Sequence, residues 1–162
     1  MAIIIEGQSL CSLCQATLGR DKVYILTPPL TGNTKDPLFP FSDAGIHLEC
    51  RDRLGIKEKL LEHIYLYEEG MPPANQRCVV DGERIANPRD LLCFGLLTSV
   101  DTEELHCFNY LSFNSNNINT WDACDRFLAL PRQFLSEGKW EGMAGLNKLA
   151  YIVERVAAHR QG

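Results

Sequence analysis

The sequence lacks any opening apolar segment long enough to cross a bilayer. The first apolar run extends only from Ala2 to Ile5, and no basic residue precedes it, so we expect neither a membrane span nor a signal peptide there. Hydrophobic residues make up 45% of the chain and charged residues 23%, a balance typical of a folded globular protein. We therefore expect a cytoplasmic protein with one compact domain or two small ones that share a core.

A surplus of basic residues is also absent, because the formal net charge is −5. Proteins that hold nucleic acids by neutralising phosphates generally carry such a surplus. General nucleic-acid binding is therefore disfavoured, although Arg51, Arg53 and Lys57 could still form a local basic patch along one predicted helix.

Motifs of several enzyme classes are missing. The chain has no Walker-type phosphate loop, no Gly-x-Ser-x-Gly elbow and no zinc-deaminase order of His-x-Glu followed by Pro-Cys-x-x-Cys. A cysteine and a histidine from distant positions could still form a nucleophilic pair. With that alternative open, the sequence favours a protein without catalytic residues.

Cysteine, by contrast, is frequent. The chain holds seven cysteines, an odd number that cannot all pair, and a reducing cytosol disfavours disulfides. Metal binding by some of these thiols, with the others buried, explains the count better.

Four residues have the spacing of metal ligands. Cys11 and Cys14 form a C-x-x-C pair, and His47 and Cys50 form an H-x-x-C pair. Three thiolates and one imidazole make a closed tetrahedral shell, which is the pattern of one structural zinc ion and is unsuited to magnesium or calcium. The alternative is that the cysteines are small buried apolar residues and that His47 is a hydrogen-bonded surface residue.

The segment between the two pairs predicts how they meet. Residues 23–26 favour a strand, and residues 27–40 favour a loop because they include four prolines. Ser42 and Asp43 suit the start of a helix that would carry His47 and Cys50 on one face of its first turns.

The order of knuckle, strand-containing hairpin and ligand-bearing helix resembles a treble-clef zinc finger over roughly residues 8–56. The resemblance implies an α+β fold with short hairpins and one structural zinc ion. Some treble clefs are nucleases with a histidine base on the hairpin, but no histidine lies between Cys14 and His47. A RING domain would need eight ligands crossed between two sites, so the resemblance to that class is loose and implies no partner.

A shift of 67 positions aligns the first half of the chain with the second without a gap. The four candidate ligands Cys11, Cys14, His47 and Cys50 then fall on Cys78, Asp81, Asn114 and Asn117. Two amides bring no anionic charge to an ion, so we expect a second treble-clef-like unit that is degenerate and metal-free, held by hydrogen bonds and apolar residues. Coincidence is the alternative, since the aligned identities are few.

The remaining cysteines, Cys93, Cys107 and Cys124, match no ligand spacing and are expected to be core or surface thiols. A second metal site from Cys78, Cys93, His106 and Cys107 is conceivable.

We expect a helix over residues 56–69, a short helix that Pro131 starts and Gly138 stops, and an amphipathic helix from Lys139 to Arg160 that packs across both units or captures a partner helix. The predicted divisions are 1–69, 70–130 and 131–162.

These features favour a protein-binding module, such as an adaptor or a toxin-neutralising immunity protein. An acidic surface would steer a basic partner towards the protein. The candidate contact residues are Glu58, Glu62, Glu68, Glu69, Asp101, Glu103 and Glu104. The alternative is a zinc-finger regulator that binds nucleic acid.

Overall fold

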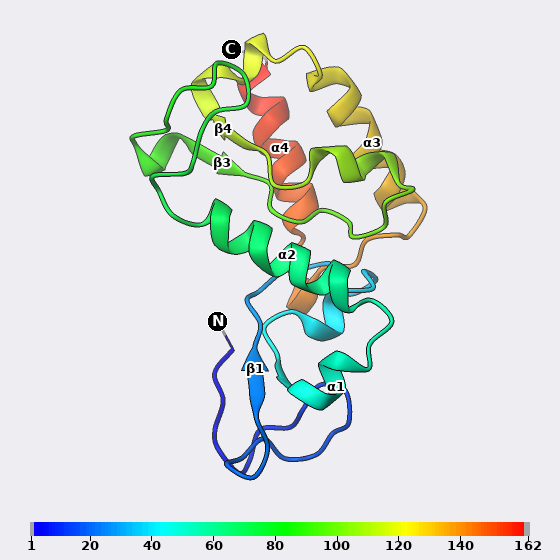
Figure 1. Cartoon of the computed structure of the whole chain (residues 1–162). Helices are drawn as coiled ribbons and strands as arrows, with labels where there is room; N and C mark the ends of the chain where they lie inside the picture. Colours follow the sequence, from blue (N-terminus) through cyan, green and yellow to red (C-terminus); the bar gives the residue numbers. More distant parts are fainter. Residues whose placement is uncertain (1, 161–162) are drawn as a thin grey trace.

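Two antiparallel hairpins provide the strands of the protein, one in each half of the chain (Figure 1). The computed structural model describes residues 2–160. Its strands are β1 (Tyr24–Leu26), β2 (Gly45–His47), β3 (Leu91–Cys93) and β4 (Ser112–Asn114), and its α-helices are α1 (Leu48–Asp52), α2 (Lys57–Gly70), α3 (Cys124–Ser136) and α4 (Lys148–Arg160). This mixture fits the expected α+β class. No helix within residues 2–160 is both long and apolar enough to span a membrane.

Each hairpin has its own hydrophobic core. The N-terminal core contains Cys11, Leu18, Leu30, Leu38, Phe41, Ile46, Leu60 and Leu96. The C-terminal core is larger and is centred on fully buried Phe94, Phe113 and Phe127, where the rings of Phe94 and Phe127 stack with centroids 4.5 Å apart. Figure 1 shows α2 lying between the two halves, with α3 and α4 around the second hairpin. Burial of each large aromatic side chain contributes roughly 1.5–3 kcal/mol.

The prediction of a helix that begins at Ser42 and Asp43 is wrong. Thr27 and Ala44 exchange hydrogen bonds, with the Ala44 N–H donating to Thr27 Oγ1 at 3.0 Å, and this draws the chain into strand β2. Asp43 itself adopts a positive φ of 52°. Hairpin pairing therefore overrides the local capping pattern, and the helix begins only at Leu48, with His47 as its N-cap residue.

The prediction that Pro131 starts a helix is wrong, because Pro131 lies inside α3. A proline there removes one backbone hydrogen bond. The buried face formed by Phe127, Pro131 and Phe134 at helical spacing offsets that loss by packing on the C-terminal core. The stop at Gly138, which has a φ of +67°, agrees with the prediction.

The expected helix from Lys139 to Arg160 is also wrong in its first part, because residues 139–147 contain only a short 3-10 turn at Met143–Gly145 and α4 begins at Lys148. Gly142 packs so closely on the Leu146 carbonyl that a side chain would overlap it, and Ala144 has a positive φ of 51°. The buried residues of α4 are Leu149, Ile152 and Val156. They belong to the C-terminal core, so α4 packs on one half rather than across both.

Segment 139–142 instead connects the two halves. The Asn33 amide donates to the Lys139 carbonyl at 3.0 Å and accepts from the Glu141 N–H at 3.0 Å. Thr34 donates its N–H to the Glu141 carbonyl at 2.8 Å. These bonds hold the segment that precedes α4 against the loop after β1.

The two hairpins have matching registers. Tyr24 pairs with His47, and Leu91 pairs with Asn114, each 67 positions further on. The isolated bridge Leu10–Thr17 is repeated 67 positions later by the bridge Arg77–Arg84. The turn hydrogen bond from the Gln15 N–H to the Cys11 carbonyl is repeated by the bond from the Gly82 N–H to the Cys78 carbonyl. Asp43 and Tyr110, also 67 positions apart, both have a positive φ. The ungapped spacing found in the sequence therefore relates equivalent backbone positions.

Candidate metal centre

The first two candidate ligands lie in a tight turn before β1. The bridge between Leu10 and Thr17 closes this turn, and the Gln15 N–H donates to the Cys11 carbonyl at 3.0 Å. Gln15 adopts a positive φ of 58°, which reverses the chain directly after Cys14. Both sulfurs consequently face the same side of the turn.

His47 and Cys50 come from the end of β2 and from α1. The Ser12 N–H donates to the Gly45 carbonyl at 3.1 Å and so ties the turn to β2 two residues before His47. A Cβ at Gly45 would overlap the Leu18 side chain, so glycine lets Leu18 pack directly against β2. The ligands of the second pair therefore reach the turn from a strand and a helix, rather than from one helix as predicted.

All four candidate ligands converge. One ligand atom from each of Cys11, Cys14, His47 and Cys50 lies within 4.8 Å of every other. His47 Nδ1 lies 3.4 Å from Cys14 Sγ, and the His47 N–H lies 3.5 Å from Cys11 Sγ. Zinc bonds of about 2.0–2.3 Å in a tetrahedron place neighbouring ligand atoms roughly 3.5–3.8 Å apart. The group could therefore hold one metal ion, and three sulfurs and an imidazole suit zinc.

His47 is not the surface residue of the alternative interpretation, because it is 1% exposed. Its Nε2 is buried and has no hydrogen-bond partner among residues 2–160. Burying an imidazole with so little hydrogen bonding is costly. A metal bond at Nδ1, which lies 3.4 Å from Cys14 Sγ, would offset part of the cost of burying the ring, and the donor set fits a bound ion.

The pKa values of two of the thiols, Cys11 and Cys50, are shifted in opposite directions. Burial raises the pKa of Cys11, but backbone N–H groups that point at its sulfur, those of Cys14 and His47 first, bring the pKa down to about 6. Burial and the two neighbouring cysteines raise the pKa of Cys50 to about 11. Negative charge on three adjacent sulfurs is thus unfavourable without a cation, and a bound cation would favour the thiolates.

The arrangement has a structural rather than a catalytic donor set. A catalytic zinc ion generally has three protein ligands and keeps one position for water or substrate. Here four good donors surround one point, which leaves no such position. The zinc ion, when bound, would join the turn, the hairpin and α1.

The equivalent position in the second hairpin is held by hydrogen bonds. The Asn117 amide donates to Asp81 Oδ2 and to Cys78 Sγ, the latter at 3.7 Å. Asn114 Oδ1 instead accepts from the Asn116 N–H at 3.1 Å, so it caps the turn that follows. Hydrogen bonds between side chains thus join the residues that stand at the ligand positions of the second hairpin.

The other cysteines do not form a second cluster. Cys93 and Cys107 are exposed, whereas Cys78 and Cys124 are buried. Within residues 2–160, the Cys11 group is the only set of three or more Cys, His, Asp or Glu side chains with ligand atoms in reach of one another. The structure therefore does not bring Cys78, Cys93, His106 and Cys107 together.

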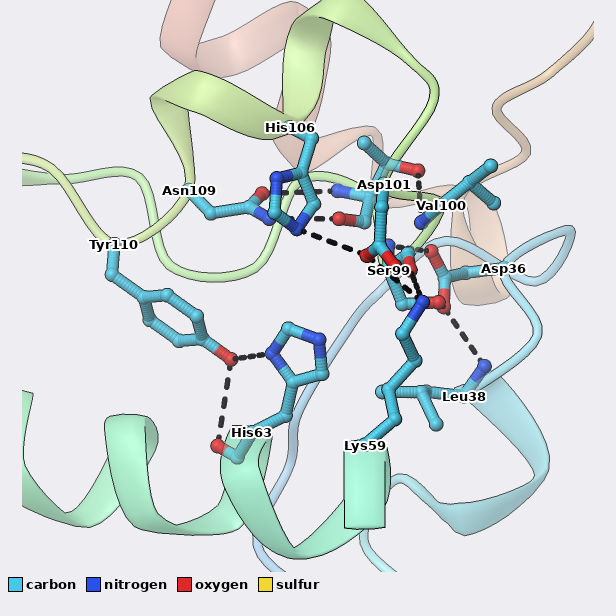
Figure 2. A network of polar contacts seen from close by, with 11 residues as sticks. Asp36, Leu38, Lys59, His63, Ser99, Val100, Asp101, His106, Asn109 and Tyr110 are labelled. Atoms are coloured by element: carbon cyan, nitrogen blue, oxygen red, sulfur yellow. Dashed lines mark hydrogen bonds and ion pairs between the residues drawn. The ribbon is translucent and has the colours of Figure 1, made fainter. Parts of the chain in front are cut away.

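A polar network missed by the sequence analysis joins the two halves beside α2 (Figure 2). Asp36 is 4% exposed; it accepts hydrogen bonds from the Ser99 hydroxyl and N–H, both at 2.7 Å, and from the Leu38 N–H at 2.8 Å. Lys59 donates to the Ser99 carbonyl at 2.6 Å and pairs with Asp101 at 2.9 Å. Asp36 and Ser99 are 63 residues apart, so no local spacing could reveal this contact.

The network contains aspartate, histidine and serine but no catalytic relay. His63 Nδ1 bonds to the Tyr110 hydroxyl at 2.9 Å, and Ser99 bonds directly to Asp36. A Ser-His-Asp triad requires the histidine to lie between the other two. Burial lowers the pKa of His63 and raises that of Tyr110, which favours the neutral form of both. The network is a structural clasp.

Searches of protein-family models, curated proteins and solved structures find nothing that matches this chain.

Proposed function

We propose that this chain is a non-catalytic, zinc-stabilised protein-binding module, of the adaptor or toxin-neutralising immunity kind, built from two treble-clef-like units. The closed donor set of Cys11, Cys14, His47 and Cys50 supports a structural zinc ion. The observation that carries the binding role is the outward face of α2, where an exposed tyrosine lies among acidic residues.

The tandem interpretation rests on the shared register of the two hairpins. Pairing of Tyr24 with His47 and of Leu91 with Asn114 relates the hairpins at the spacing that also relates the ligand positions. Hydrogen bonds from Asn117 stand where Cys50 completes the first cluster. In the second unit, packing and hydrogen bonding replace the ion.

The face of α2 that points to solvent carries Glu58, Glu62, Tyr65 and Glu69 at positions i, i+4, i+7 and i+11. Tyr65 is 60% exposed. Within residues 2–160, these carboxylates form no ion pair. Tyrosine is enriched in binding hot spots, and unpaired carboxylates attract a basic partner. The surface therefore suits a basic protein.

Three other acidic candidates already have partners. Asp101 pairs with Lys59 at 2.9 Å, Glu103 with Lys139 at 2.9 Å, and Glu104 with Arg126 at 3.6 Å. Their charges are partly neutralised within the chain, so we place the proposed contact on α2.

The basic residues considered for nucleic-acid binding also have acidic neighbours. Arg51 and Lys57 contact Asp52 at 2.7 and 3.1 Å, and Arg53 contacts Glu49 at 3.8 Å. These pairs reduce the positive potential that phosphates would meet. Protein binding is accordingly the function we favour.

Affinity capture from the host, with quantitative mass spectrometry, tests this proposal. We expect the wild-type protein to retain a basic protein, and a Glu62→Lys, Tyr65→Ala double variant to lose it. A Glu154→Lys, Tyr151→Ala variant makes the same changes on α4, where Tyr151 is 56% exposed, and should retain the partner. Equal capture by both variants would refute the α2 surface. Tight, steeply salt-dependent binding to DNA or RNA would instead favour the nucleic-acid alternative.

A further inference from the structure

A large hollow lies where the two halves of the chain meet. Its volume is about 860 Å³, within the range of small-molecule sites. The walls come from the loop after β1, the C-terminal end of α2, the second hairpin and the start of α4. Most of the lining is apolar, with Leu30, Phe39, Leu91, Met71 and Met143 among the lining residues.

One cation points into this hollow. Lys148, the first residue of α4, is the only basic residue among the described residues that line it. Its amine lies against the backbone of Gly95, so close that a Cβ there would be 2.7 Å from Nζ. Gly95 has a φ of +65°, and the missing side chain leaves the space that the amine occupies.

The amine has no acidic partner. Within residues 2–160, no carboxylate lies within ion-pair distance of Lys148, and no hydrogen bond engages it. Lys148 is an exposed residue whose side chain is open to the hollow, and desolvation where its amine lies against Gly95 lowers its pKa. An unpaired, partly desolvated amine in this position gains from an anion that replaces lost water.

The other polar groups of the hollow define the rest of the site. Tyr67, Cys93, Tyr110 and Asp43 are among the lining residues. Burial, and to a smaller extent the negative charge of Asp43, raise the pKa of the Tyr67 phenol. The Cys93 thiol acts against the effect of desolvation and raises the pKa of Lys148. Lys148 is the one cation of the lining and Asp43 is an acidic residue on the same wall, so a ligand with one negative charge suits the hollow better than a phosphate with two.

We propose that this hollow binds a small organic carboxylate with a large apolar body. Lys148 holds the carboxylate beside Gly95, and the apolar walls cover the remainder of the molecule. This site is separate from both the metal centre and the outward face of α2, so it stands independently of the proposed function.

Protection of Cys93 from N-ethylmaleimide tests the proposal in the intact, metal-loaded protein. The probe is dodecanoate below its micelle-forming concentration, with dodecanol as the neutral comparison, and peptide mass spectrometry follows each thiol. Dodecanoate should slow the labelling of Cys93 much more than dodecanol does. Exposed Cys107 does not line the hollow and should label at an unchanged rate.

Variants at Lys148 separate charge recognition from apolar burial. Lys148→Met should weaken protection by dodecanoate about tenfold, to the level of dodecanol, because it removes a charged hydrogen bond. Lys148→Arg should keep the preference for the carboxylate. Absence of protection by dodecanoate, equal protection by dodecanol in the wild-type protein, or equal protection of Cys107 would overturn the proposal.

Discussion

Cys14 Sγ lies 3.4 Å from His47 Nδ1, although 33 residues separate them in the chain. Backbone bonds produce this approach, since Ser12 donates to the Gly45 carbonyl at 3.1 Å and so fixes the turn against β2. The polypeptide thus positions two of the four donors with backbone contacts, and a metal ion would complete the cluster.

Removing one thiolate should release the ion and destabilise the fold. We expect Cys14→Ser and Cys50→Ser each to lower the free energy of unfolding by roughly 3 kcal/mol or more, because metal binding to a structural site is part of the folding free energy. Urea unfolding followed by circular dichroism measures the change. Cys107→Ser, at an exposed thiol outside the cluster, should change stability by less than about 0.5 kcal/mol; equal effects in all three variants would contradict the metal account.

Placing metal ligands at the equivalent positions of the second hairpin should create a second metal site. In the triple variant Asp81→Cys, Asn114→His, Asn117→Cys, the new side chains join Cys78 at positions with the register of the first cluster. Cobalt titration should then show two tetrahedral sites per chain instead of one. A Cys78→Ser change added to the triple variant is the control and should abolish the second site. A triple variant that folds but binds a single ion would refute the equivalence of the two units.

Asp36 should be among the most sensitive polar positions. Asp36→Asn replaces one acceptor oxygen of the buried carboxylate with an NH2 group, which cannot accept the hydrogen bonds that this oxygen receives from Ser99 or Leu38. We expect a loss of about 2 kcal/mol in the free energy of unfolding, the usual contribution of hydrogen bonds to a charged group. Asp101→Asn affects an exposed ion pair with Lys59 and should cost less than about 1 kcal/mol.

His63 should make stability depend on pH below its ordinary pKa. Burial lowers the pKa of His63 in the folded chain below 6.5, so the unfolded chain takes up a proton first as the pH falls. The stabilisation is complete above pH 6.5 and is lost as the pH falls towards the folded pKa. Unfolding free energies of wild type and His63→Asn between pH 7 and about 5 measure this difference, since both keep the metal centre. A shared slope in wild type and His63→Asn would contradict the prediction.

The sequence predicts the local parts of this structure well. Residues 23–26 predict β1, and the structure places it at Tyr24–Leu26. The helix expected over residues 56–69 is α2, at Lys57–Gly70. Ligand spacing names the four residues that converge, because short motifs determine the geometry of each pair.

Contacts between distant segments could not be predicted. Ser42 is a residue type that often caps helices, yet the hydrogen bonds between Thr27 and Ala44 draw the residues after Ser42 into strand β2. Pro131 looks like a helix start, but burial beside Phe127 keeps it inside α3. The clasp of Asp36 and Ser99 and the hollow around Lys148 depend on tertiary packing, which no sequence period encodes.

The most direct test of the central claim is the metal content of the intact protein, measured by native mass spectrometry after purification from its own host. The account predicts one zinc ion per chain, held by Cys11, Cys14, His47 and Cys50. A folded protein without zinc or any other metal ion would contradict it.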